Sequence, residues 1–385
     1  TMDLLQIVKG FNEILWNNFL MYVLLGVGIF YTIYLGVPQI RHFGLAMKYS
    51  FGSIFKKKEK TEDACDQTNS FQALATAVAA QVGTGNIAGV ATAIAMGGTG
   101  AVFWMWISAA LGMSTIFSEA VLSQKYREIR DGQVVGGPAY YISRGLKSRV
   151  LAIIFSVMVI VALGFIGCMV QANSISIGLA SAFGMKGWVS GILIAVLVAV
   201  VIVGGQKRVT TIAELVVPFM ALAYIVGAII ILFMYSDQIL PVFESIFGDA
   251  FSTKAAAGGA AGSVMKYAIR YGVSRGLFSN EAGMGSTPHA HALAHVKDPS
   301  IQGFVAMSGV FVDLLICTAT ALIILLTGAY AESGLISVQI TQRAFEVTFG
   351  QAGVAFLAIS LLIFAFTTII GWYVFGEMNI RYLFK

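Results

Sequence analysis

Residues 81–89 read QVGTGNIAG, and residues 276–285 read GLFSNEAGMG. Each stretch puts several glycines and one asparagine into the middle of an apolar segment. Because glycine costs about 1 kcal/mol relative to alanine inside a helix, each cluster favours local unwinding. The two cores also match, since Asn86–Gly89 and Asn280–Gly283 share the pattern Asn, any residue, Ala, Gly. We therefore predict two helices that are broken at corresponding points.

The chain around these stretches has the composition of a membrane protein. It is 58% hydrophobic and 11% charged, with a mean hydropathy of +0.83, whereas soluble domains are about 45–50% apolar and about 25% charged. Apolar spans of about 20 residues, the length that crosses a bilayer, recur along the whole chain. They lie near 14–38, 70–96, 99–124, 149–178, 187–204, 209–235, 262–294, 301–328 and 350–380. The stretches 238–252 and 335–348 read as amphipathic interfacial helices or re-entrant loops.

The formal net charge of +5 is explained by topology, and we expect no nucleic-acid partner. Most Lys and Arg residues fall on one side if the N-terminus is placed outside, as the positive-inside rule requires. The chain is then a multi-pass plasma-membrane protein with cytoplasmic basic loops. The first broken span runs from inside to outside and the second runs from outside to inside.

Glycine-interrupted spans in corresponding positions of two inverted units indicate a transporter binding site near the bilayer midplane. Unwound backbone is tolerated there only where protein or a wet cavity satisfies its polar groups. The alternative is that the glycines merely let helices pack closely. We favour a binding site, because both breaks carry an asparagine and polar neighbours.

Three motifs resemble one family of carriers. VGTGNIAGV at 82–90, GGPAYY at 136–141 and SNEAGMGS at 279–286 are similar to the alanine or glycine:cation symporter family. That family belongs to the amino acid-polyamine-organocation superfamily and is similar to the LeuT-type fold. The resemblance implies an all-α polytopic membrane protein with an inverted repeat, broken first and sixth core helices and one extra N-terminal helix. It extends over essentially the whole chain from about residue 10.

The resemblance also implies a division of the chain. Residues 1–40 form the extra transmembrane helix, 41–69 a cytoplasmic basic loop and 70–235 the first five-helix repeat. Residues 236–261 are an extracellular connection, and 262–385 belong to the second repeat. Since that fold has five helices in each repeat, we expect about two helices of the second repeat to be missing.

A broken helix can bind both ends of a zwitterion. The free N–H groups that start an outgoing half-helix suit a carboxylate, so Thr84, Gly85 and Asn86 are assigned to carboxylate contacts. Gly83 and Gly85 let the backbone approach the ligand. Gln81 lies at the break and is a candidate for the ammonium or for a gate.

A sodium site follows from the LeuT-type resemblance. It joins the carbonyls of Ala79 and Val82 to residues of the eighth core helix, Phe364, Thr367 and Thr368. Sodium is a hard cation that prefers such oxygen ligands. The alternative is that each threonine bonds the carbonyl four residues before it in its own helix. A second sodium site using Asn86 is a further option, and sodium is the only metal and no other cofactor is expected.

The remaining pocket candidates come from three helices. The second break supplies Phe278, Ser279, Asn280 and Gly283, and the eighth core helix supplies Trp372, for which an interfacial anchor is the alternative. Phe165 and Met169 on the third core helix are weaker candidates, with core packing as the alternative.

Charged residues inside spans are functional candidates by default. The acids are Glu119, Glu214, Glu281 and Asp313.

We expect sodium-coupled symport of a small neutral amino acid, alanine or glycine, by a monomer using alternating access. A proton-coupled carrier using Glu281 or Glu214 is the alternative. A membrane enzyme is disfavoured because no HExxH or Ser/Lys dyad is found, and a channel would conduct without saturation.

We expect His289, His291 and His295 to lie in a solvated cytoplasmic loop.

Overall fold

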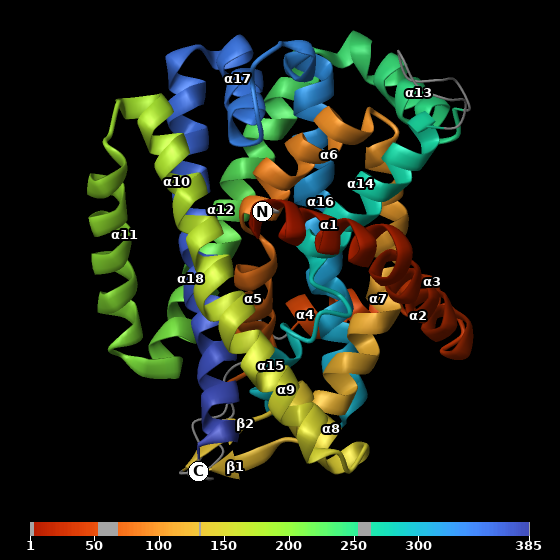
Figure 1. Ribbon diagram of the computed structural model, residues 1–385, viewed down its shortest axis with the longest axis vertical. Helices are drawn as coiled ribbons and strands as arrows, with labels where there is room; N and C mark the ends of the chain where they lie inside the picture. The colour runs from red at the N-terminus through yellow and green to blue at the C-terminus, as the bar shows by residue number, and fades with distance from the viewer. Residues whose placement is uncertain (1–3, 53–67, 131, 253–262, 385) are drawn as a thin grey trace.

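The computed structural model describes residues 4–52, 68–130, 132–252 and 263–384, and this part of the chain is almost entirely helical (Figure 1). Helix is the expected outcome, because a helix satisfies all its backbone polar groups within one segment and is stable in a bilayer. The centre of the predicted basic loop and of the predicted extracellular connection, 53–67 and 253–262, lies outside the described residues.

The N-terminal segment is one continuous helical stretch, α1–η1–α2, followed by two short helices. Its elements are α1 (Leu4–Leu15), the π-helical η1 (Trp16–Leu20), α2 (Met21–Tyr34), α3 (Pro38–Arg41) and α4 (Phe43–Phe51). Gly36 and Val37 have φ of 71° and 60° and end α2 in a tight turn. The helix predicted at 14–38 is therefore present, and α2 packs against α7.

The next segment contains the first broken helix and four further long helical stretches. Its elements are α5 (Ser70–Gln81), η2 (Gly85–Gly89), α6 (Val90–Gly97), α7 (Ala101–Lys125), β1 (Glu128–Arg130), β2 (Gln133–Val135), α8 (Pro138–Gly145), α9 (Arg149–Val159), η3 (Ile160–Gly167), α10 (Cys168–Phe183), α11 (Gly187–Ile202) and α12 (Gly205–Met234). The two strands form an antiparallel hairpin with Glu128 opposite Val135.

The last segment contains the second broken helix. Its elements are η4 (Ser236–Gln238), α13 (Ile239–Ala250), α14 (Ser263–Asn280), α15 (Pro288–Ala292), α16 (Pro299–Thr327), η5 (Ala329–Ala331), α17 (Val338–Phe349) and α18 (Gln351–Leu383). Residues 238–252 and 335–348, predicted to be interfacial or re-entrant, are largely the helices α13 and α17.

Five helical stretches in the described residues are long and apolar enough to cross a membrane. They are Ala101–Lys125, Arg149–Phe183, Gly205–Met234, Pro299–Thr327 and Gln351–Leu383, and α5 with η2–α6 forms a sixth span that bends by 48°. The apolar helices α2 and α11 are shorter. The prediction of a polytopic helical membrane protein is therefore confirmed.

The two broken helices run in opposite directions through the molecule. Helix α6 packs against α14 and α17, whereas α5 packs against α15, which contacts the hairpin strand β2. Figure 1 shows α6 and α14 toward the end of the molecule that carries α17, and α5 and α15 toward the end that carries the hairpin. The chain therefore passes from the hairpin end to the α17 end in the first broken helix and returns in the second.

The second break begins later than predicted. Residues Gly276 to Asn280 continue α14, and the irregular backbone runs from Glu281 to Thr287. Gly276 has a packing role instead, because a Cβ there would overlap the Ser108 hydroxyl of α7. Its glycine allows α14 to lie close to α7, and tertiary packing outweighs the low helix propensity.

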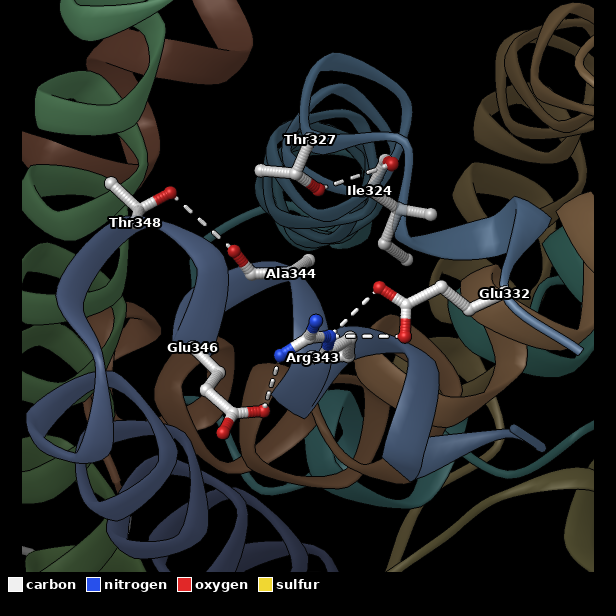
Figure 2. Close-up of polar contacts among 7 residues, drawn as sticks. All are labelled: Ile324, Thr327, Glu332, Arg343, Ala344, Glu346 and Thr348. Atoms are coloured by element: carbon white, nitrogen blue, oxygen red, sulfur yellow. Dashed lines mark hydrogen bonds and ion pairs between the residues drawn. The ribbon is translucent and has the colours of Figure 1, made fainter. Parts of the chain in front are cut away.

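Helix α17 covers the end of the molecule near the first break. Arg343 bonds both carboxylate oxygens of Glu332, at 2.8 and 3.0 Å, and a Glu346 oxygen at 3.1 Å (Figure 2). Such exposed ion pairs contribute only about 0–1 kcal/mol. The buried face of α17 provides a firmer attachment, since Phe345 is fully buried and the Thr341 hydroxyl donates to the Ile87 carbonyl at 3.1 Å.

Candidate functional site

The first break leaves helical backbone groups without their usual partners. Helix α5 starts at an Asn69–Gln72 capping box and ends at Gln81. The Gly83 N–H then donates to the Asn86 side-chain oxygen at 3.0 Å instead of continuing the helix. The Ala79 carbonyl therefore receives no bond from the N–H four residues ahead, which is the arrangement that a cation site requires.

A hydroxyl of α18 lies among carbonyl oxygens of this break. The Thr368 Oγ1 atom is 3.0 Å from the Ala79 oxygen and 3.3 Å from the Val82 oxygen. It is also 3.0 Å from the Phe364 oxygen of its own helix. A hydroxyl has one hydrogen and can satisfy one of these acceptors at a time. The cluster is therefore rich in unshared oxygen lone pairs.

Thr367 differs from its neighbour. Its hydroxyl donates to the Phe364 carbonyl at 2.8 Å and lies 3.8 Å from the Met220 sulfur. It is therefore bonded within its own helix, to the carbonyl three residues before it and not to the one four residues before it. The Thr368 hydroxyl makes the same kind of bond and also reaches the first break.

The second break is held by a carboxylate from a neighbouring helix. Glu281, Gly283 and Gly285 have φ of 56°, 83° and 75°, so three residues in five adopt left-handed backbone. The Glu119 carboxylate of α7 accepts from the Gly283 N–H at 3.0 Å and from the Gly285 N–H at 3.1 Å. Two charge-assisted bonds thus fix a backbone that only glycine adopts at low cost.

The two breaks meet in the interior. The Gln81 amide donates to the Asn280 carbonyl at 2.7 Å. A Cβ built on Gly85 would lie 3.1 Å from the Ser279 Cα, so the two backbones are in close contact there. The predicted site residues of the first and second breaks are therefore neighbours, although about 195 positions separate them.

Asp313 of α16 links the same two breaks. Its Oδ1 atom accepts from the Asn86 amide at 2.6 Å and from the Ser279 hydroxyl at 2.7 Å. The thiol of Cys317, one turn along, lies 3.2 Å from the Ser279 hydroxyl. Asp313 was noted in the sequence as a charge inside a span, and its position between the breaks required the structure.

Trp372 connects α18 to the second break. Its indole N–H donates to one Glu281 oxygen at 2.8 Å, and the Ser286 hydroxyl donates to the other at 2.6 Å. The side chain is only 4% exposed, so Trp372 is not an anchor at the membrane surface. It lies one turn from Thr368, so a single helix face contacts both breaks.

Three acidic side chains in or beside the breaks lack a cationic partner among the described residues. Glu281 and Asp313 are buried and Glu119 is partly buried, and all three accept hydrogen bonds from neutral donors only. Buried carboxylates are costly unless a cation or a proton neutralises them. This region of the molecule therefore favours the entry of cations.

Two predicted pocket residues are not brought to the breaks. Phe165 is 66% exposed and Met169 is 71% exposed, so they do not line a pocket with the residues above, and they are not core residues either. They lie on the apolar outer face of η3 and α10, which sequence cannot distinguish from an inward face when the helix is apolar all round. Phe278 is half-buried, and the Asn280 side chain accepts from the Ala282 N–H.

The histidine expectation was wrong for two of three residues. His289 and His291 are buried. The His289 ring bonds the Ser286 carbonyl at 2.6 Å and the Asn379 amide at 2.8 Å, and it stacks on Phe375. No group of three or more metal-binding side chains occurs in the part of the chain that the structure describes. His289 therefore helps to pack α15 against α18, whereas the His291 ring lies 2.8 Å from the Gln302 amide of α16.

Gln171 was missed by the sequence reading. It lies on α10, and its side-chain oxygen accepts from the Thr84 N–H at 3.2 Å. A Cβ on Gly83 would overlap the Thr368 hydroxyl and lie 3.2 Å from the Gln171 oxygen. An amide inside a largely apolar span was the signal that could have identified it.

Comparison with known proteins agrees with this geometry. The chain matches the sodium:alanine symporter family over residues 1–385. It is 46% identical over 380 residues to an uncharacterized transporter of Haemophilus influenzae, covering 98% of this chain and 77% of that protein. It is 40% identical over 391 residues to the sodium/alanine symporter AgcS of Methanococcus maripaludis, covering 99% and 84%.

Two further similarities are informative. The chain is 42% identical over 390 residues to the putative sodium/proton-dependent alanine carrier YrbD of Bacillus subtilis, covering 98% of this chain and 78% of that protein. A crystal structure of a manganese transporter mutant from Eremococcus coleocola has a TM-score of 0.55 at 12% identity, covering 86% and 69%, and shows a shared fold only. The chain is a transporter that carries out cation-coupled amino acid symport rather than an enzyme, and it belongs to the sodium:alanine symporter family.

Proposed function

We propose that the protein couples the uptake of a small neutral amino acid, alanine or glycine, to the entry of sodium. The observation that supports this most strongly is the position of the Thr368 hydroxyl among the carbonyl oxygens of Ala79, Val82 and Phe364. Sodium binds at the centre of this cluster between the carbonyl oxygens and a lone pair of the Thr368 oxygen, whose hydrogen turns away from the ion. Thr367 joins the ligands if its side chain rotates away from the Phe364 carbonyl.

The amino acid binds beside the sodium site. Its carboxylate takes the N–H groups at the start of the outgoing half-helix, at Thr84 and Gly85, where the backbone is free of helical bonds. Its small side chain faces the second break, with Trp372 and Phe278 as walls. The close contact between Gly85 and Ser279 leaves little room and favours a small substrate.

Coupling follows from the shared backbone of the first break. The Val82 carbonyl that holds sodium is separated by only one or two residues from the N–H groups of Thr84 and Gly85 that hold the carboxylate. Sodium draws Ala79 and Val82 toward α18 and so fixes the backbone that the amino acid needs. Each ligand therefore raises the affinity for the other by the same factor.

Transport proceeds by alternating access in a LeuT-type inverted repeat. The opposite directions of the two broken helices support this repeat. The basic loops face the cytoplasm, so the hairpin end is the inner end of a monomer in the plasma membrane. Helix α17 then lies at the outer side, over the first break.

Proton coupling is the second candidate. It is favoured by the absence of a cationic partner for Glu281 and Asp313 in the described residues, because a buried carboxylate without such a partner readily takes a proton. The ion gradient that drives alanine accumulation distinguishes proton coupling from sodium coupling. A proton-coupled carrier accumulates alanine in response to an acid-outside pH gradient in choline buffer, and a sodium-coupled carrier does not.

Radiolabelled alanine uptake into proteoliposomes tests the proposal. With an inward sodium gradient the vesicles accumulate alanine above the external concentration, and excess unlabelled glycine competes. Equal accumulation when choline replaces sodium would remove sodium coupling. Uptake that does not saturate with alanine would instead indicate a channel.

A further inference from the structure

The motif GGPAYY at 136–141 has no part in the proposed ion and amino acid sites, and it builds a corner at the hairpin end of the molecule. Gly137 has φ of 115° and leads into α8. A Cβ built on Gly137 would overlap the His289 ring, so the motif packs closely on α15. Tyr140 is buried, and the Arg130 guanidinium of the hairpin lies 5.3 Å from the centre of its ring. The motif therefore fixes α8 against both α15 and the β1–β2 hairpin.

The turn from α8 into α9 has a fixed backbone. Lys147 has φ of 53°, a left-handed conformation that a residue with a side chain keeps only where its surroundings enforce it. The Ser148 side chain accepts from the Leu151 N–H at 3.4 Å and so caps α9, and the two helices pack on each other. Lys147 is itself exposed. It is therefore carried on an ordered turn at the surface of the molecule.

Three exposed cations lie within six residues at this turn, and they have too few acidic partners. Arg144 pairs with Glu128 at 2.5 Å, but the same carboxylate also accepts from Arg130 at 2.9 Å, so two arginines share one acid. In the part of the chain that the structure describes, no acidic side chain pairs with Lys147 or Arg149, which are both exposed. The turn therefore carries positive charge that an external anion can neutralise.

Exposed apolar side chains alternate with these cations. Leu146 is 69% exposed and Val150 is 68% exposed. The stretch Arg149–Phe183, which is long and apolar enough to cross a membrane, begins between them. Leu146 and Val150 therefore lie at the level where the hydrocarbon of a bilayer meets its head groups. A surface that combines cations with apolar side chains at this depth suits an amphiphile, whereas a free anion would use only the cations.

We propose that this turn binds the phosphate head group of an anionic phospholipid. The α8–α9 corner consists of Arg144, Leu146, Lys147, Arg149 and Val150. The three cations bind the head group, and the two apolar side chains contact the acyl chains. Lys and Arg side chains beside a membrane span each add to the attraction for anionic lipid. The corner is separate from the two helix breaks, so this proposal does not depend on which ion or amino acid is carried.

The corner is connected to the second break by direct packing. A Cβ built on Gly285 would lie 2.8 Å from the Phe155 ring of α9 and 2.9 Å from Pro138 of α8. Helices α8 and α9 therefore enclose the irregular backbone of the second break on that side. A lipid that binds across their turn holds the two helices together and so stabilises the packing around Gly285. We expect a bound anionic lipid to raise the thermal midpoint of the protein.

A lipid titration of the full chain in detergent tests the proposal. Dioctanoyl phosphatidylglycerol should raise the thermal midpoint of the wild type in a saturable manner. Dioctanoyl phosphatidylcholine and inorganic phosphate at the same concentrations should change it little. The double variant Lys147→Gln/Arg149→Gln should need about tenfold or more phosphatidylglycerol for half-maximal stabilisation. Leu146→Gln keeps the charge and should need about threefold or more, because it loses the apolar contact.

The matched control removes one Lys and one Arg elsewhere. Lys186 and Arg208 are exposed and flank α11, which Figure 1 shows on the opposite side of the molecule from α8. The double variant Lys186→Gln/Arg208→Gln should stay within about twofold of the wild type, since charges far from the site are screened. Both double variants change exposed side chains only, and a size-exclusion profile equal to that of the wild type confirms that each is folded.

Three results would overturn the proposal. Equal weakening in the two double variants would mean that the lipid responds to the total charge of the protein and not to the α8–α9 corner. Stabilisation by inorganic phosphate equal to that by phosphatidylglycerol would mean that the corner binds a free anion. A thermal midpoint of the wild type that does not respond to phosphatidylglycerol would mean that no lipid holds α8 and α9 together.

Discussion

The Thr368 hydroxyl lies 3.0 Å from the Ala79 carbonyl oxygen, across 289 positions of sequence. The contact joins α18 to the end of α5, at a carbonyl that has lost its usual helical donor. Because α18 contacts the break through this hydroxyl, an ion that binds in the break changes the contact between the two helices.

Replacing Thr368 by valine removes the hydroxyl and keeps the shape of the side chain. We expect the sodium concentration for half-maximal alanine uptake to rise about tenfold or more, equivalent to about 1.4 kcal/mol. Thr327→Val is the matched control, since its hydroxyl makes an ordinary bond to the Ile323 carbonyl within α16 (Figure 2 shows the residue). Sodium titration of uptake provides the measurement. An unchanged sodium dependence in Thr368→Val would remove this residue from the site.

We predict that uptake requires glycine at position 83, because there is no room for a side chain. A Cβ there would overlap the Thr368 hydroxyl, whereas a Cβ on Gly89 would meet nothing nearer than 3.9 Å. Overpacking of this kind costs about 1–3 kcal/mol. We expect Gly83→Ala to lower the rate of uptake about tenfold or more and Gly89→Ala to stay within about twofold. Initial rates at equal protein content in the vesicles decide between them, and equal rates would contradict the packing argument.

Glu119 is predicted to stabilise the second break. Gln in its place keeps one acceptor oxygen for two N–H donors, so either Gly283 or Gly285 is left unsatisfied at a cost of about 1–3 kcal/mol. We expect a clear fall in the thermal midpoint in detergent. Glu377→Gln, which affects a partly exposed pair with Arg381, is the control and should change little. A midpoint for Glu119→Gln equal to that of the control would show that the break holds its shape without this carboxylate.

Trp372 and Glu281 are predicted to act as a pair. Trp372→Phe removes a donor from a buried carboxylate, so it should destabilise the wild-type protein more than it destabilises a Glu281→Gln background. The expected coupling is about 1–3 kcal/mol, the range for residues in contact. Thermal midpoints of the two single variants and the double variant give this value. Strictly additive shifts would mean that the 2.8 Å contact contributes nothing to stability.

The architecture could be predicted from sequence because the apolar spans that indicate it are each about 20 residues long. Apolar spans of bilayer length and the interruption at Gly83 and Gly85 are visible without any structure, and the 48° bend falls where those glycines lie. The second break was placed too early. Gly276 and Gly283 look alike in sequence, yet one permits close packing on α7 and the other adopts φ of 83°.

The candidate site could be predicted only in part. Residues within the breaks are neighbours in sequence, so their grouping follows from the motif, and the pairing of Thr368 with Ala79 and Val82 followed from resemblance. Gln171 and Glu119 come from other helices, and their contacts depend on helix rotation. Phe165 and Met169 illustrate the opposite error, since they were predicted to line the pocket and are exposed. In a helix that is apolar all round, sequence alone does not indicate which residues face inward.

The most direct test is equilibrium binding of radiolabelled alanine to purified protein in detergent, in sodium and in choline buffer of equal ionic strength. The wild type should bind alanine at least tenfold more tightly in sodium, and Thr368→Val should lose most of that difference while keeping its affinity in choline. Equal alanine affinity in the two buffers for the wild type would contradict the claim that sodium and amino acid share the first break.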